Sequence, residues 1–199
     1  MIGVMLTTPC IRSGRVVLRH AGLTFTAKTS ADGIVALSLP AFETEAEVLA
    51  LDAQGELVRA SVIVADAAAM RRFALSWMSE HAIDLRINEG DLVFVSRNEA
   101  SDVLGNQRLM GFGDRSVATP MLAKVYTYPA DPATKVEIQV EIGVTPANCG
   151  RDIAVDVIAG RSGMSDTSKV SISIPPCDAA GDILVLKNLA PDTKIAADN

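Results

Sequence analysis

Apolar and polar residues alternate along most of this chain. The clearest alternation lies in residues 136–142, 153–157 and 170–174, where an aliphatic side chain occupies every second position. Side chains two residues apart lie on the same face of a β-strand. Each of these segments therefore predicts a strand with one buried face, and the segments between them are rich in turn residues.

The same pattern recurs through the rest of the chain and predicts about thirteen strands with frequent turns, which is typical of β-sandwiches and barrels. Residues 97–120 lack this periodicity. We therefore expect an all-β antiparallel sandwich architecture with two sandwich-like halves, 15–96 and 121–199, joined by a long loop or linker at 97–120. One continuous sandwich is the alternative. Residues 1–14 show no clear period and predict a loose arm.

Particular turns and one buried face can be predicted within the first half. Residues 29–33 and 52–55 have the composition of hairpin turns, with Gly33 supplying a positive φ. Phe73, Leu75 and Trp77 alternate, which places all three on one strand face and predicts that Trp77 is buried.

The segment 97–120 is long for a connection in a compact domain, and such loops often carry function. It contains Arg108, Met110, Phe112 and Arg115. Exposed arginine, methionine and phenylalanine together are typical of protein interfaces, so these four residues form the candidate partner-binding loop. The alternative is that Met110 and Phe112 fold back to cap the core.

The residues that usually carry catalysis or bind metals do not form a motif in this chain. The two histidines, His20 and His81, lie outside any recognisable catalytic pattern and are expected at the surface. The cysteines have no CxxC spacing, and no phosphate-binding glycine motif is present. Acidic residues cluster at Asp32 and at 43–47, where the alternation is typical of a solvated strand face. We expect no catalytic, cofactor-binding or metal-binding residues and no cofactor.

Charge narrows the range of partners. The net charge is −6, and no basic patch of the kind found in nucleic-acid-binding proteins is visible. No apolar run approaches the roughly 20 residues of a membrane-spanning helix. The start of the chain lacks a basic segment and a long apolar run, so no signal peptide is predicted within it. A protein partner or assembly subunits are the expected partners, and the oligomeric state is left open.

Cys149 precedes the second of the three clearest strands and Cys177 follows the third. These positions lie at the same end of two antiparallel neighbours, where a disulfide is geometrically compatible. Cys10 would then be the unpaired cysteine.

Two resemblances add to this interpretation. Residues 28–40 (KTSADGIVALSLP) resemble the hairpin of carboxypeptidase-regulatory-like and transthyretin-like modules. Residues 18–22 (LRHAG), 148–151 (NCGR), 176–177 (PC), 184–189 (LVLKNL) and 194–196 (KIA) resemble a family of uncharacterised exported β proteins of proteobacteria. The second resemblance implies a periplasmic or lipoprotein location and a bond between Cys149 and Cys177, but no biochemical activity.

The preferred function is a non-enzymatic module of the cell envelope or surface, periplasmic or extracellular, that binds a partner through loops. One alternative is a structural component of a larger assembly, such as a phage-like particle or an appendage. The other is a hydrolase with dispersed carboxylates.

Overall fold

The computed structural model describes residues 1–78, 81–96, 108–131, 133–187 and 189. Fifteen strands and two short 3-10 helices occupy these ranges, and the strands form four antiparallel sheets. The expected all-β antiparallel fold with several sheets is therefore confirmed.

The first six strands form two sheets, which we call the N-terminal sandwich. The smaller sheet pairs β1 (Ile2–Thr7) with β4 (Ile34–Leu39). The larger sheet has the order β3 (Leu23–Lys28), β2 (Arg15–His20), β5 (Glu45–Leu51) and β6 (Glu56–Ile63).

The remaining strands form two further sheets. Because a disulfide between Cys149 and Cys177 links two of the segments that connect their strands, we call this pair of sheets the stapled sandwich. The central sheet has the order β10 (Leu109–Phe112), β11 (Met121–Pro129), β7 (Met70–Met78), β13 (Asp152–Arg161) and β14 (Met164–Ser173). The outer sheet has the order β15 (Ile183–Lys187), β12 (Val136–Gly143), β8 (Ile83–Glu89) and β9 (Leu92–Val95). The 3-10 helices are η1 (Ala65–Ala69) and η2 (Cys177–Ala179).

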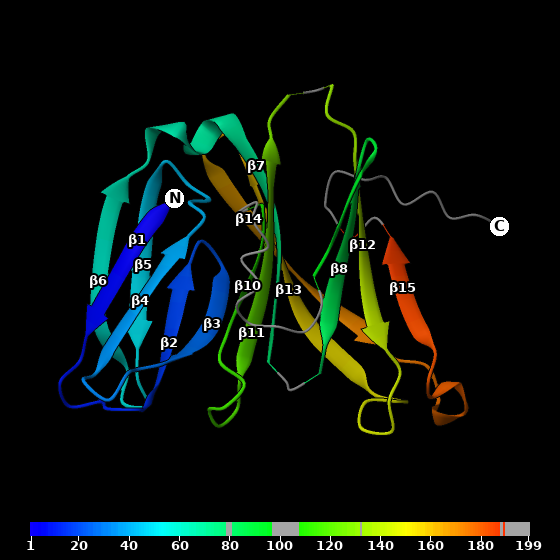
Figure 1. Ribbon diagram of the computed structural model, residues 1–199, viewed down its shortest axis with the longest axis horizontal. Coiled ribbons are helices and arrows are strands. Elements are labelled where there is room, and N and C mark those ends of the chain that lie inside the picture. Colours follow the sequence, from blue (N-terminus) through cyan, green and yellow to red (C-terminus); the bar gives the residue numbers. More distant parts are fainter. Residues whose placement is uncertain (79–80, 97–107, 132, 188, 190–199) are drawn as a thin grey trace.

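The central sheet lies between the other layers, with the N-terminal sandwich on one side and the outer sheet on the other (Figure 1). Strand β7 is therefore buried on both faces. Phe73, Leu75 and Trp77 point into the core shared with the outer sheet, whereas Ala74 belongs to the core shared with the N-terminal sandwich. Trp77 is 3% exposed, and its Nε1 donates to the carbonyl of His81 at 3.0 Å. The predicted burial of Trp77 is confirmed.

The sheets do not follow the predicted division at 97–120. Strands β7, β8 and β9 precede this segment, yet β7 pairs with β11 and β13, and β8 pairs with β12. The predicted halves 15–96 and 121–199 thus share two sheets, and the chain passes from the N-terminal sandwich to the central sheet through η1 instead. Alternation identifies strands but does not specify their partners, which explains the difference.

Two other local expectations need correction. Residues 1–14 do not form a loose arm throughout, because β1 pairs along its length with β4. Residues 29–33 do not join a hairpin, because β3 and β4 belong to different sheets. The glycine is nevertheless required at this turn: Gly33 has φ +77°, and a Cβ there would lie 2.3 Å from the carbonyl oxygen of Thr8.

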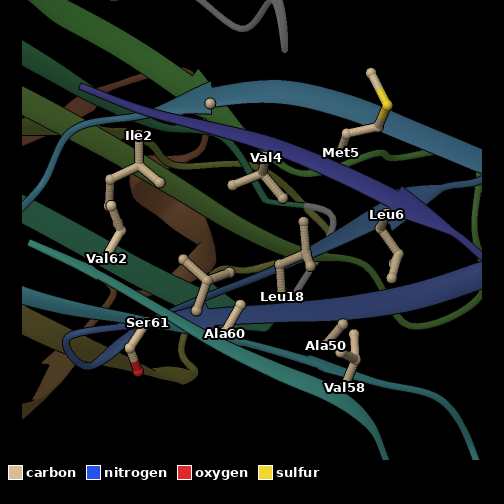
Figure 2. Close-up of a pocket in the computed structure, with 12 residues that line it drawn as sticks. Ile2, Val4, Met5, Leu6, Leu18, Ala50, Val58, Ala60, Ser61 and Val62 are labelled. Atoms are coloured by element: carbon tan, nitrogen blue, oxygen red, sulfur yellow. The ribbon is translucent and has the colours of Figure 1, made fainter.

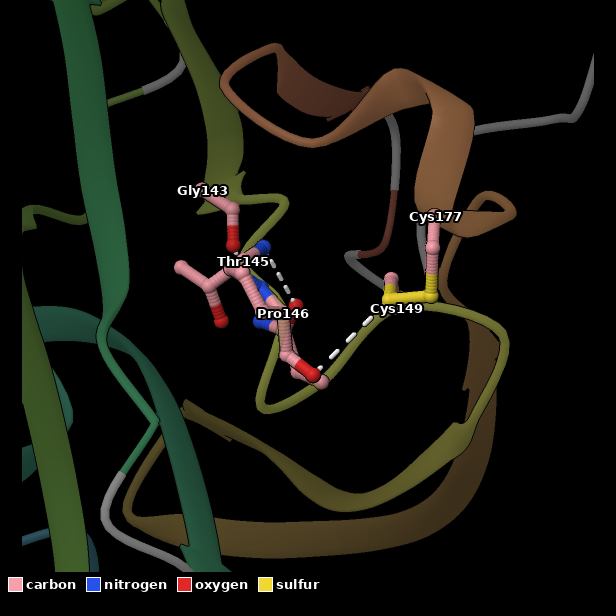
Figure 3. Close-up of a disulfide and its surroundings, with 6 residues drawn as sticks. Gly143, Thr145, Pro146, Cys149 and Cys177 are labelled. Carbon is pink, nitrogen blue, oxygen red and sulfur yellow. Dashed lines mark hydrogen bonds between the residues drawn. A yellow bond between two sulfur atoms is a disulfide. The ribbon is translucent and has the colours of Figure 1, made fainter.

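The predicted disulfide is present (Figure 3). Cys149 and Cys177 are bonded across a Cα–Cα distance of 4.9 Å, beside the paired strands β13 and β14. The buried Asn148 organises the turn before the bond: its Oδ1 accepts from Thr145 N at 2.7 Å, and its Nδ2 donates to Gly143 O at 2.8 Å. Cys10 is free and exposed.

Candidate functional site

A groove lies between two strand edges of the N-terminal sandwich. Strands β1 and β6 each end a sheet, and within the described residues neither edge is hydrogen-bonded to another strand. The hollow between them measures about 230 Å³. A second hollow of about 440 Å³ lies between the start of β1 and the end of β6. We call this region the edge groove.

Apolar side chains from four strands line the edge groove. Ile2, Val4 and Leu6 point from β1 toward Leu18 of β2 and Ala60 of β6, whereas Met5 points away (Figure 2). On β6, the groove-facing row consists of Val58, Ala60 and Val62. The strands β2 and β5 complete the lining with Leu18, Val48 and Ala50.

The two walls of the groove differ in how well they are covered. Ile2 and Leu6 are each only 7% exposed, because β1 packs over the larger sheet. Every residue of β6 is exposed, including Val58 at 46% and Val62 at 45%. The smaller sheet has two strands and the larger has four, so the inner face of β6 has no covering strand among the described residues.

Local sequence determines where β6 begins and ends. At its start, the Asp52 carboxylate accepts from the backbone N–H groups of Gln54 at 2.8 Å and Gly55 at 3.0 Å, and Gly55 has φ +135°. This turn joins β5 and β6, so the hairpin predicted at 52–55 is confirmed. At its end, the alanine-rich η1 turns the chain away toward the central sheet.

The charged residues of β6 lie outside the groove and are neutralised locally. Arg59 forms ion pairs with Glu47 at 3.2 Å and Glu56 at 3.1 Å. The hydrogen bond from Arg59 lowers the pKa of Glu56, and the same bond raises the pKa of Arg59. The groove-facing row of β6 thus carries no charge that would oppose pairing with another strand.

The four residues of the predicted binding loop do not form one surface. Phe112 is 8% exposed, and its ring lies 5.0 Å from that of Phe25 in the core shared with the N-terminal sandwich. Met110 packs against the same core. Arg108 faces the outer sheet instead, and Arg115 is half-buried after β10. The segment 109–112 is a strand, while the predicted loop residues 97–107 lie outside the described part of the chain.

Arg108 belongs to an aromatic and ionic cluster between the central and outer sheets. Its guanidinium donates to Glu89 and lies 5.3 Å from the centre of the Phe94 ring, while Tyr126 also donates to Glu89. Burial alone would raise the pKa of Glu89, but the hydrogen bonds from Arg108 and Tyr126 outweigh it and lower that pKa. Burial, together with the bond to Glu89, raises the pKa of Tyr126.

A second ion pair joins the same two sheets. Lys124 is 6% exposed, and its Nζ donates to Asp84 at 2.5 Å and to the carbonyl of Ser96 at 3.0 Å. Burial lowers the pKa of Lys124, and the contact with Asp84 opposes that shift. These polar groups are engaged with one another and connect layers of the fold, so their arrangement is structural.

The histidines and acidic residues are also dispersed. His20 is not at the surface as expected but is 2% exposed: its Nδ1 lies 2.8 Å from Glu47 O, and its Nε2 accepts from Phe42 N at 3.2 Å. Glu43 accepts from Ser165 at 2.6 Å, away from the Arg59–Glu47 pair. Among the residues that the structure describes, no three histidine, cysteine, aspartate or glutamate side chains are placed to hold a metal ion.

Comparisons with known proteins add no relative: no family model, no curated protein and no solved structure matches this chain. In the described ranges, no helix has the length and apolar character needed to cross a membrane.

The edge groove was not predicted from the sequence, although two signals for it are present. Ile2, Val4 and Leu6 occupy alternate positions at the start of the segment 1–14, although this short alternation does not extend through the rest of that segment. In 56–63, apolar residues occur on both faces of the predicted strand, at Leu57 and Val58 and again at Val62 and Ile63. Apolar residues on both faces indicate a strand that is buried on both sides, yet both faces of β6 are exposed in the single chain.

Proposed function

We propose that this chain is a non-enzymatic protein-binding module of the cell envelope or surface, and that it binds an extended strand of a protein partner at the edge groove. An exposed strand edge offers unpaired N–H and C=O groups to a partner strand, and an adjoining apolar groove receives that strand's alternate side chains. The supporting observation is β6, which is exposed on both faces and carries an uncharged, apolar row toward the groove.

The groove supports this function better than the loop does. Met110 and Phe112 pack into a core, so they are not available to a partner in this arrangement. By contrast, Val62 in the groove is 45% exposed, and Ile63 beside it is 67% exposed. Exposed apolar side chains gathered at one edge are typical of interaction sites.

A location outside the reducing cytosol, in the periplasm or outside the cell, is part of the proposal. The bond between Cys149 and Cys177 supports it, since disulfides form and persist in oxidising compartments.

Site-specific photo-cross-linking tests the proposed binding. A benzophenone side chain at Val62, in the groove, should give a discrete covalent adduct with a partner polypeptide after irradiation in the producing cell. Ile183 is the matched control because it is 63% exposed but lies on β15 of the outer sheet, on the other side of the central sheet from the groove (Figure 1). Equal labelling from both positions, or none from Val62, would exclude the groove as the binding site.

A further inference from the structure

The sequence of β6 is complementary to itself. Read outward from Ala60, Val58 and Val62 lie at equal distances, and so do Leu57 and Ile63, so the large apolar positions on the two sides of Ala60 match. We infer that the partner at the edge groove is a second copy of this chain, whose β6 pairs antiparallel with β6 of the first about a two-fold axis at Ala60. This inference rests on the function proposed above and names its partner.

The register follows from the two faces of the strand. Residues directly opposite each other in an antiparallel pair share a face. The groove-facing row therefore continues across the axis only in registers that place even-numbered residues of one β6 opposite even-numbered residues of the other. Pairing about Ala60 is such a register. It places Val58 opposite Val62 of the second copy, and Leu57 opposite Ile63 of the second copy. Each exposed apolar side chain then meets another, with the small Ala60 at the axis.

The charges of β6 are compatible with this pairing. Arg59 lies opposite Ser61 of the second copy, and Glu56 lies opposite Val64 of the second copy, so no like charges face each other directly. Glu47 and Glu56 already balance Arg59 within each chain. Like charges placed directly opposite in a sheet are destabilising, and their absence here favours self-pairing.

The pairing would also cover the β6 edge and the groove that are exposed in a single chain. Two four-stranded sheets would join into one continuous sheet, which removes both β6 edges from solvent. The two grooves would meet at the axis and bury their Val58 and Val62 side chains in a shared apolar interior. A contact of this kind uses the same patch on both copies and closes as a dimer.

Disulfide trapping tests the register directly. In a Cys10→Ser background, which removes the free exposed thiol, Ala60→Cys places two thiols opposite each other on the axis. Mild oxidation should convert the purified protein at micromolar concentration to a covalent dimer on a non-reducing gel. Ser61→Cys in the same background is the control, because its counterpart in the second copy lies diagonally across the pair and should cross-link far less.

A charge variant tests the same interface without cross-linking. Ala60→Lys would place two ammonium groups at the axis and should weaken dimerisation at least about tenfold by sedimentation equilibrium. Met5→Lys is the matched control, because Met5 is exposed beside the groove but points away from it. Both variants should retain the wild-type circular dichroism spectrum, since Ala60 and Met5 are exposed.

The outcomes separate this inference from the proposed function. A dimer that is trapped in the Ala60→Cys variant and weakened by Ala60→Lys supports the second copy. A monomer that does not trap overturns it, as does a dimer equally weakened by Met5→Lys. If the Val62 photoadduct then contains a different protein, the groove still binds a partner and only the identity of that partner is wrong. If Val62 gives no adduct either, both proposals fall.

Discussion

Strands β6 and β14 both end a sheet, but they carry opposite kinds of side chain. β14 presents serines together with Asp166 and Lys169 along an edge that no other described strand pairs with. Charged and polar side chains protect an edge from adding another strand. On β6, the only charged residues are Glu56 and Arg59, and its groove-facing row is Val58, Ala60 and Val62. The side chains of β14 therefore protect its edge, whereas β6 presents at its edge the apolar row to which the proposed partner would pair.

The two sandwiches differ in the same way. In the stapled sandwich, the central and outer sheets bury a continuous core, and the disulfide closes one end. In the N-terminal sandwich, a two-stranded sheet covers only part of a four-stranded one. The difference predicts that the stability of the monomer resides mainly in the stapled sandwich, whereas the proposed association would use the N-terminal one. Four measurements test this contrast.

The largest effect should follow from truncating Trp77. The Trp77→Ala substitution empties a site buried between the central and outer sheets and should lower the free energy of unfolding by about 3–5 kcal/mol. Urea titration followed by far-ultraviolet circular dichroism measures this change, because Trp77 is the only tryptophan and the variant loses that fluorescence. A loss below about 1 kcal/mol would show that this core contributes little.

Removing the disulfide should have the next largest effect. The bond closes a loop with a sequence separation of 28 residues, so Cys149→Ser combined with Cys177→Ser should cost about 3 kcal/mol in the same titration. Cys10→Ser should leave stability unchanged, because that residue is exposed and unbonded. Intact-mass analysis after alkylation of the native, non-reduced protein should show one modified cysteine. Three modified cysteines would mean that the bond is absent in solution.

Acid should destabilise the N-terminal sandwich through His20. Burial lowers the pKa of His20 below 6.5, an effect to which the positive charge of Arg72 adds and which Glu43 and the Glu47 carbonyl partly oppose. The unfolded chain therefore binds a proton more readily than the folded one. Stability due to His20 is complete above pH 6.5 and decreases as the pH falls from there toward the folded-state pKa.

The matched variant for this prediction is His20→Asn. Losing the bond from Phe42 N should cost about 1–3 kcal/mol at pH 7.5, and the difference in stability between pH 7.5 and pH 5.0 should shrink relative to the wild type. An unchanged pH dependence in the variant would assign the acid sensitivity to other groups.

The strands and the disulfide could be predicted from the sequence because their signals are local. Alternation in 136–174 identified β12, β13 and part of β14, and the positions of Cys149 and Cys177 relative to those strands allowed the bond. The sheet partners could not be predicted in this way. Any strand with one apolar face satisfies the same pattern, and the pairing of β7 with β11 and β13 depends on contacts far apart in the sequence.

The candidate site was harder to predict because it depends on which strand is left without a covering strand in the folded chain. Met110 and Phe112 are residue types that are common at interfaces, but their position on β10 places them in or against the core. Val58 and Val62 have the composition of a core, but β6 lies at an edge, and no described strand covers it. Amino-acid composition alone does not distinguish an apolar residue buried within the chain from an exposed apolar residue at an interaction surface, because the same types of side chain occur in both places.

The smallest effect should come from a valine-to-threonine change at the edge groove, set against the same change in the stapled sandwich. Val157 is 1% exposed, and Val157→Thr buries a hydroxyl among apolar side chains, which should cost about 1–3 kcal/mol. Val62 is 45% exposed, so Val62→Thr should alter the stability of the dilute monomer by less than about 0.5 kcal/mol. The two variants have the same chemistry and nearly the same shape, so their difference reports burial alone. A cost at Val62 close to that at Val157, measured at a concentration too low for the proposed dimer to form, would mean that the edge groove is already closed within a single chain.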